Sequence, residues 1–228
     1  MPMNRDKKTK TQISLSLLIL LLGALNIGAL YAGNRPLVYL TKPATMLVVL
    51  SLAAVERAAM PGRYGTLIMA GLVCSLAGDI FLMLPSDQFV QGLVSFLIAH
   101  LFYIGAFRSG MSGVGPLWFV LPFCAYGFLA LWLLLPGLGD MKLPVIVYLV
   151  VILTMAWQSA VRWNANRDRS SVVAFAGALL FAASDSIIAF NRFRWRFYLA
   201  EGLIMSTYFT AQWLIALSVW KLPRKTAG

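Results

Sequence analysis

Charged residues are scarce in this sequence. Of its 228 residues, only 12% are Asp, Glu, Lys or Arg, whereas 60% are hydrophobic, and the mean hydropathy is +0.79. A soluble globular domain carries charge on about a quarter of its residues and is nearer half apolar. The composition therefore excludes an ordinary soluble domain and indicates a membrane protein.

Residues that bind metals or form disulfides are also few. His100 is the one histidine, and Cys74 and Cys124 are the two cysteines. Zinc sites generally use several His, Cys or carboxylate ligands, so we expect no metal. Both cysteines fall inside apolar runs, which predicts buried thiols and no disulfide. The chain has no glycine-rich phosphate loop and no heme or flavin motif, so we expect no cofactor.

Long apolar runs, by contrast, occupy most of the chain. A helix needs about 20 mostly apolar residues to cross a bilayer, and eight runs are close to that length. They are Ile13–Tyr31, Pro36–Val55, Tyr64–Leu84, Phe89–Phe107, Val114–Leu135, Leu143–Val161, Ser171–Phe190 and Phe197–Val219. We therefore predict an all-α polytopic membrane protein of eight transmembrane helices. These form one domain, 13–219, between basic cytoplasmic tails at 1–12 and 220–228.

The basic residues predict the orientation in the membrane. A net charge of +11 would suggest nucleic-acid binding in a soluble protein. Here most Lys and Arg lie in loops and tails, so we expect no nucleic-acid partner. Thirteen of the nineteen fall on the side of the bilayer that holds both termini. Because cytoplasmic loops carry the excess of Lys and Arg, both termini are predicted to be cytoplasmic. The first run exceeds the 7–15 apolar residues of a signal peptide, which favours a retained span over a cleaved leader.

Two spans share a pattern. The segments GLVCSLAGDIFLML (Gly71–Leu84) and GALLFAASDSIIAF (Gly177–Phe190) each begin with Gly and place an Asp eight residues later. The offset of 106 residues is near half the chain, and the spans that follow, from Gly92 and Gly202, also resemble each other. Each pair runs in one direction, which favours a parallel four-plus-four repeat, although apolar helices also resemble one another by chance.

Polar residues inside the spans concentrate in one layer near the non-cytoplasmic boundary. Five of them come from five different spans: Asn26, Lys42, Asp79, Asp185 and Glu201. The fourth and eighth spans continue the polar positions inward with His100, Tyr103, Tyr208 and Gln212. Polar groups in lipid must face one another or water. We therefore predict a pocket that opens on the non-cytoplasmic side. The alternative is that Lys42 pairs with a carboxylate and only fixes helix packing.

Asp79 and Asp185 are the residues best suited to chemistry. Two carboxyl groups close together in a low dielectric cannot both ionise cheaply, so one serves as an acid and the other as a base. This division suits acid-catalysed cleavage of an ether through an oxocarbenium ion, and it equally suits proton-coupled transport. A triad of His100 with Ser75 or Ser184 and an Asp also stays open, without a GxSxG motif to support it.

Four segments carry these polar residues in a characteristic order. They are YLTKP (Tyr39–Pro43), LAGDIFLML (Leu76–Leu84), the Phe89–Tyr103 run with its HxxY, and AGALLFAASD (Ala176–Asp185). Together they resemble the YhhN-like lysoplasmalogenases, a family of integral membrane vinyl-ether lipid hydrolases. The similarity spans nearly the whole chain beyond the N-terminal tail.

The resemblance implies an enzyme of the bacterial inner membrane that cleaves the vinyl-ether bond of lysoplasmalogens. The products would be a fatty aldehyde and glycerophosphoethanolamine or glycerophosphocholine, and the expected partners are this lysophospholipid and membrane lipid. Asp79 and Asp185 would be catalytic, and Lys42, with Arg192, would hold the lipid phosphate. The residues expected to contact the substrate are Asn26, Lys42, His100, Tyr103, Glu201, Tyr208 and Gln212. The alternative function is a proton-coupled or lipid transporter built on the helix repeat.

Overall fold

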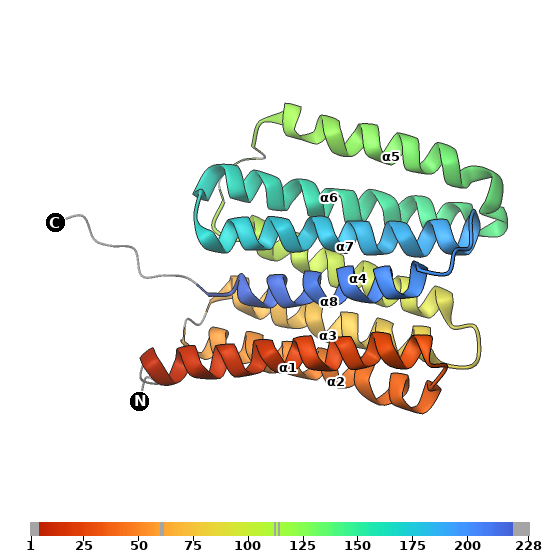
Figure 1. Cartoon of the computed structure of the whole chain (residues 1–228). Coiled ribbons are helices and arrows are strands. Elements are labelled where there is room, and N and C mark those ends of the chain that lie inside the picture. The colour runs from red at the N-terminus through yellow and green to blue at the C-terminus, as the bar shows by residue number, and fades with distance from the viewer. Residues whose placement is uncertain (1–4, 60–61, 112, 114, 221–228) are drawn as a thin grey trace.

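The computed structural model describes residues 5–59, 62–111, 113 and 115–220, which form an all-α structure (Figure 1). Its helices are α1 Arg5–Tyr31, α2 Arg35–Ala59, α3 Arg63–Met83, α4 Phe89–Arg108, α5 Leu121–Leu134, α6 Lys142–Asn166, α7 Arg169–Phe193 and α8 Ala200–Leu217. Short 3-10 turns flank α5 at Leu117–Val120, Leu135–Gly137 and Gly139–Met141. The predicted all-α fold class is confirmed, since the described residues contain no strand.

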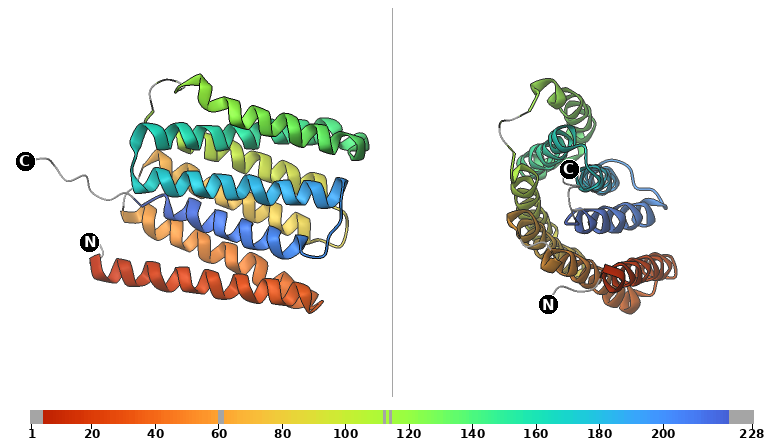
Figure 2. Two further views of the ribbon diagram at one scale, coloured as in Figure 1. Left: turned by 45° about the horizontal axis from the view of Figure 1, so that its top comes forward. Right: turned by 90° about the vertical axis from the view of Figure 1, so that its left-hand side faces the viewer.

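The helices alternate in direction and form a curved bundle (Figures 1 and 2). Viewed along the helix axes in Figure 2, α3, α4, α6 and α5 follow an arc, α7 and α8 lie inside it, and the α1–α2 pair closes one end. The pairs α3–α4 and α7–α8 pack closely, while α8 also packs on α1 and α2. The start of α1 and the end of α8 lie at one end of the bundle (Figure 1). We call the opposite end, where α1, α3 and α7 finish, the far end.

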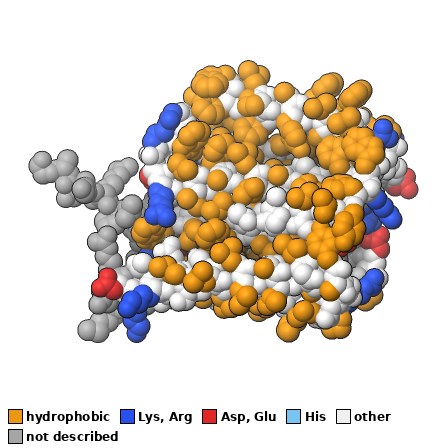
Figure 3. Space-filling view, in the orientation of Figure 1, with side chains coloured by type: hydrophobic (Ala, Val, Ile, Leu, Met, Phe, Trp, Pro, Cys, Tyr) orange, Lys and Arg blue, Asp and Glu red, His pale blue; other side chains and the backbone are white. Residues whose placement is uncertain are grey.

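The bundle has the surface of an integral membrane protein. Seven described helices, α1 to α7 with their flanking turns, are long and apolar enough to cross a membrane. Helix α8 is not among them, because polar side chains such as Glu201, Tyr208 and Gln212 interrupt its 18 residues. On the face shown in Figure 3, hydrophobic side chains cover the middle and charged side chains gather at the two ends. The eighth span and the cytoplasmic termini stay predictions.

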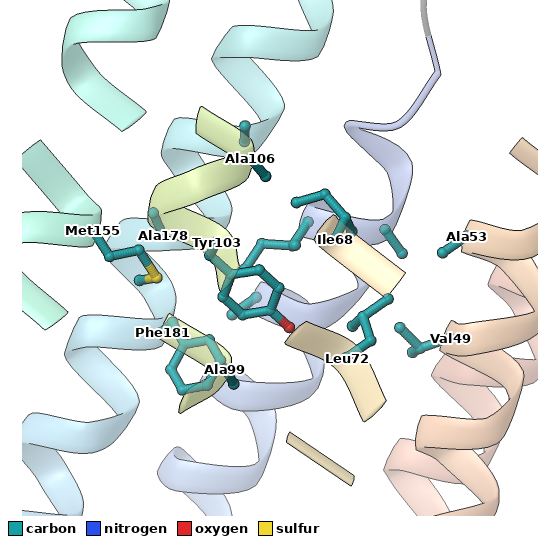
Figure 4. Packing of buried hydrophobic residues seen from close by; sticks show 14 of the residues in the cluster. Val49, Ala53, Ile68, Leu72, Ala99, Tyr103, Ala106, Met155, Ala178 and Phe181 are labelled. Atoms are coloured by element: carbon teal, nitrogen blue, oxygen red, sulfur yellow. The ribbon is translucent and has the colours of Figure 1, made fainter. Parts of the chain in front are cut away.

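The core runs through the bundle, and buried residues of α2, α3, α4, α6, α7 and α8 contribute to it. Tyr103 of α4 is fully buried among Leu72 of α3 and Phe181 of α7 (Figure 4). Glycine allows α3 and α4 to approach each other closely, because a Cβ at Gly78 of α3 would lie 2.7 Å from the ring of Phe96 on α4. Small residues at helix crossings are typical of bundles packed in membranes. The sequence therefore brings α3 and α4 close enough for their polar side chains to share one interior.

A two-residue link joins α6 to α7. Arg167 adopts a left-handed conformation with φ 51° and ends α6, and Asp168 caps α7. The Asp168 carboxylate accepts the backbone N–H of Ser171 at 2.8 Å, and the Ser171 hydroxyl accepts the N–H of Asp168 at 3.2 Å. This reciprocal cap holds α6 and α7 antiparallel and adjacent, which lets Tyr148 of α6 meet Asp185 of α7.

Several details differ from the sequence-based prediction. Helix α1 begins at Arg5, so the predicted tail 1–12 is helical from that residue onward. Lys8 on this turn lies 2.8 Å from the carboxylate of Glu56, which is fully buried just beyond the predicted second span. Cys124 is exposed on α5 and Cys74 is half-buried, against the expectation of buried thiols. The predicted tail 220–228 lies outside the described residues beyond Trp220, and the four-plus-four repeat stays a prediction.

Candidate functional site

Asp79 lies in a buried polar network near the far end of α3. Its side chain is almost fully buried. Oδ1 lies 3.1 Å from Nζ of Lys42 on α2, and Oδ2 accepts a hydrogen bond from the Tyr208 hydroxyl on α8 at 2.5 Å. A buried carboxylate is tolerated only when it is paired and hydrogen-bonded, and both oxygens of Asp79 have such partners. Helices α2 and α8 therefore fix the carboxylate that α3 carries.

The network continues from Tyr208 into the middle of the bundle. Gln212, one turn later on α8, donates from Nε2 to the Tyr208 hydroxyl at 3.2 Å. Its Oε1 accepts from the Tyr103 hydroxyl on α4 at 3.0 Å, and that hydroxyl lies 3.3 Å from the Ser75 hydroxyl. Four of the predicted binding residues, Lys42, Tyr103, Tyr208 and Gln212, thus belong to one connected network with Asp79.

Asp185 has a different kind of partner. The Tyr148 hydroxyl on α6 donates a hydrogen bond to its Oδ2. No cation pairs with Asp185 in the part of the chain that the structure describes. Asp185 and Tyr148 line a small cavity of about 40 Å³ whose other walls are mostly apolar side chains of α5, α6 and α7. One aspartate therefore sits beside an ammonium group, and the other beside a neutral tyrosine in apolar surroundings.

An aromatic cluster lies between the two aspartates' partners. No hydrogen bond joins the two carboxyl groups directly. The ring centroid of Phe181 is 5.5 Å from that of Tyr208 and 4.7 Å from that of His100, which in turn lies 5.3 Å from Tyr148. His100 is fully buried, and neither ring nitrogen has a hydrogen-bond partner among the described residues. The predicted binding residue His100 is thus next to both sites without bonding to either.

Lys42 connects Asp79 to a cavity of about 540 Å³ at the far end, lined by residues of α1, α2, α3 and α8. Asn26, on the same wall, is fully buried and donates from Nδ2 to the Thr41 hydroxyl at 2.9 Å, which links α1 to α2. Glu201 also lines this cavity, but it is exposed. Three of the five residues of the predicted polar layer, Asn26, Lys42 and Glu201, thus line one pocket, whereas Asp79 and Asp185 do not line it.

Arg192 does not lie beside Lys42, where a second ligand of the lipid phosphate was predicted. Its guanidinium lies 2.7 Å from the Asp87 carboxylate in the α3–α4 loop and 4.0 Å above the Phe89 ring centroid. The hydrogen bond from Arg192 lowers the pKa of the exposed Asp87 carboxyl below its usual value. Arg192 is thus engaged with the α3–α4 loop and does not line the cavity that Lys42 reaches.

Tyr148 is the functional candidate that sequence reasoning missed. With Val145 and Ile152 it follows the spacing of core residues on one face of α6, and all three are buried. A signal was nevertheless present, because a tyrosine hydroxyl inside a spanning helix needs a hydrogen-bond partner. An unpaired Asp on the adjacent span was a candidate for that partner.

The arrangement suits proton transfer. Among the residues that the structure describes, no three His, Cys, Asp or Glu side chains are grouped so as to hold a metal ion. A carboxylate beside Lys42 can accept a proton, and a carboxyl beside Tyr148 can donate one. The interior therefore holds two carboxyl groups with different partners, which is the arrangement that an acid and a base would need.

Comparison with known proteins identifies one family that the chain matches. The model of the YhhN family matches residues 37–219. Lysoplasmalogenase TMEM86B of Sus scrofa is 35% identical over 182 residues, covering 78% of this chain and 74% of that protein. TMEM86B of Homo sapiens is 38% identical over 172 residues, covering 71% and 67%. The uncharacterized membrane protein YhhN of Escherichia coli O157:H7 is 29% identical over 198 residues, covering 86% and 93%. No solved structure matches the chain.

Proposed function

This chain belongs to the YhhN family, and from that membership we propose that it is a membrane-embedded hydrolase of the lysoplasmalogenase type. Its substrate is a lysophospholipid whose single chain is attached through a vinyl ether. Hydrolysis gives a fatty aldehyde and glycerophosphoethanolamine or glycerophosphocholine. The names of the mammalian relatives support the reaction class. The observation in this molecule that carries the proposal is the Lys42–Asp79 pair and the Asp185–Tyr148 pair inside one bundle, joined through the packed rings of Tyr208, Phe181, His100 and Tyr148.

The partners of the two aspartates suggest a division of roles. The ammonium group of Lys42 stabilises a negative charge on Asp79, so Asp79 serves as the base and as the anion that stabilises positive charge. Asp185 has a neutral partner, and its Oδ1 has no hydrogen-bond partner among the described residues. Asp185 is therefore the group that carries the proton. Tyr148 positions its carboxyl group by holding the other oxygen.

The reaction begins with proton transfer to carbon. Asp185 donates its proton to the vinyl carbon farther from the ether oxygen, and the electrons of the double bond form the new C–H bond. The resulting oxocarbenium ion is stabilised by the negative charge of Asp79. General acid catalysis of this kind contributes about 10²–10⁴-fold to a rate.

Water then completes the hydrolysis. Asp79 takes a proton from water as the water oxygen bonds to the oxocarbenium carbon, which gives a hemiacetal. The hemiacetal loses its hydroxyl proton to Asp185, and the departing glycerol oxygen receives the proton held by Asp79. One water is consumed, and both aspartates return to their starting states.

Release of aldehyde tests the proposal directly. Purified protein in detergent micelles, incubated with an alkenyl lysophospholipid, should release fatty aldehyde and glycerophospho-alcohol in equal amounts. The matched alkyl lysophospholipid lacks the double bond. It should give no aldehyde, because it has no vinyl carbon that can accept the proton. If the vinyl ether also gives no aldehyde while reconstituted vesicles show proton-driven lipid uptake, the transporter alternative holds.

We further propose that the eighth helix crosses the membrane and that both termini are cytoplasmic, as the distribution of basic residues predicts. A reporter fused after Gly228 should then be active in the cytoplasm of a bacterial host. A second reporter fused in the α7–α8 link, after Arg196, should be active in the periplasm. Periplasmic activity of the first fusion would show that the number of spans or the orientation is wrong.

A further inference from the structure

Two cavities adjoin at the far end of the bundle. One is the cavity that Lys42 lines, and the other, of about 450 Å³, lies between the end of α1 and the α7–α8 link. Leu30 and Glu201 line both of them. Glu201 therefore stands at their common boundary, and the reaction proposed above gives it no task.

Aromatic rings line the second cavity together with Glu201, and the exposed cation Arg196 also lines it. The rings of Tyr31 and Tyr198 lie 5.3 Å apart and line the second cavity with Glu201. Gly202 allows Tyr31 to lie against the first turn of α8, since a Cβ there would be 3.0 Å from its Cε2 atom. The Tyr31 hydroxyl also donates to the Leu199 carbonyl at 3.5 Å. A carboxylate beside aromatic faces is the combination that proteins use to bind organic cations.

A cation faces the same space. Arg35 lines the first cavity with Glu201, and within the described part of the chain neither residue forms an ion pair. Lys42 lies deeper on that wall and is occupied by Asp79. A guanidinium group binds phosphate oxygens in a bidentate manner. The paired cavities therefore fit a ligand that carries both a phosphate and an ammonium group.

We propose that Glu201, Tyr31 and Tyr198 bind the ammonium group of a zwitterionic phospholipid head, while Arg35 binds its phosphate. This inference rests on the proposed function, because it identifies the part of the lysophospholipid that occupies the two cavities. The site lies at the helix ends, the level at which a bilayer places its headgroups. The glycerol and the vinyl ether then extend past Lys42 toward the aspartates.

A structural role for Glu201 makes a different prediction. Glu201 lies in the first turn of α8, where a negative charge stabilises the helix dipole. If that were its only role, replacing Glu201 would change kcat/KM to the same extent for every substrate. The discriminating measurement therefore compares headgroups with and without an ammonium group.

The experiment uses Glu201→Gln with alkenyl lysophospholipids that carry phosphocholine, phosphoethanolamine or a bare phosphate. For the two ammonium lipids, kcat/KM should fall about tenfold through KM, as the loss of a carboxylate–ammonium contact in an aromatic site implies. The bare phosphate lipid should be unaffected. Arg35→Gln should raise KM for all three lipids, because each retains the phosphate. Asp140→Asn, at an exposed acidic residue of the same end, should change KM for none of them.

A binding measurement separates this inference from the proposed function. Lysophosphatidylcholine carries the same head on an ester-linked chain and has no vinyl ether to cleave. Its Kd, measured by calorimetry in micelles, should rise about tenfold in Glu201→Gln, while that of lysophosphatidic acid stays unchanged. Equal binding of lysophosphatidylcholine to wild type and variant would overturn the headgroup site. Selective loss of binding without any aldehyde release from the wild type would overturn the proposed reaction and leave the site standing.

Discussion

Replacing Asp79 or Asp185 by asparagine is expected to lower kcat for vinyl-ether cleavage by at least about 10²-fold. Each substitution keeps the volume and polarity of the side chain but removes the group that holds or accepts a proton. The loss should appear in kcat at saturating lipid, because neither carboxylate lines the cavities assigned to the headgroup. Aldehyde release over time, with the protein concentration matched, measures it.

Both variants should still insert and fold. At Asp79 a neutral amide costs less to bury than an ionised carboxylate, and at Asp185 the amide replaces a carboxyl group that is already neutral. Gel filtration and a melting curve check this before the kinetics are compared. Asp140→Asn is the matched control, because it makes the same change at an exposed residue of the turn before α6. Near-normal turnover by Asp79→Asn or Asp185→Asn would make that residue structural and refute the two-carboxylate mechanism.

The sequence located the polar interior because polarity within an apolar run is a strong signal. A polar residue in a spanning helix must find a partner, so Asp79, Tyr208 and Gln212 could be expected to face inward. The partner itself could not be predicted. Lys42 could reach Asp79, Asp185 or Glu201, and the choice depends on how α2 is rotated against α3 and α8. That rotation follows from the packing of all three helices together.

Helix ends were predicted less well than helix positions. Apolar runs report the thickness of the hydrocarbon layer, whereas backbone hydrogen bonds continue into the polar residues beyond it. Helix α1 therefore starts at Arg5 rather than Ile13, and α7 continues to Phe193. The added residues at the start of α1 carry Lys8 to the buried Glu56. An ion pair of this kind joins residues far apart in the sequence and leaves no local pattern.

The ion pair between Lys42 and Asp79 leads to the second prediction of a large effect, which concerns the variant Lys42→Met. Lys42→Met should destabilise the protein by about 3–5 kcal/mol, because it leaves the buried Asp79 carboxylate without its cation. The variant should also lose kcat, since the position and charge of Asp79 depend on the pair. If Lys42 instead held only the lipid phosphate, the substitution would raise KM and leave kcat and stability nearly unchanged. Equilibrium unfolding in mixed micelles, together with steady-state kinetics, distinguishes these outcomes.

The double variant Lys42→Met with Asp79→Asn decides whether the pair itself is the cause. Removing both charges leaves no buried ion, so the double variant should regain most of the stability that Lys42→Met alone loses, while remaining inactive. Asp79→Asn alone should be less damaging than Lys42→Met, because the ammonium group of Lys42 lines the far-end cavity and can turn toward that open space. A double variant no more stable than Lys42→Met would show that the loss comes from the packing of the lysine stem. In that case the ion pair could not be what prepares Asp79 for catalysis.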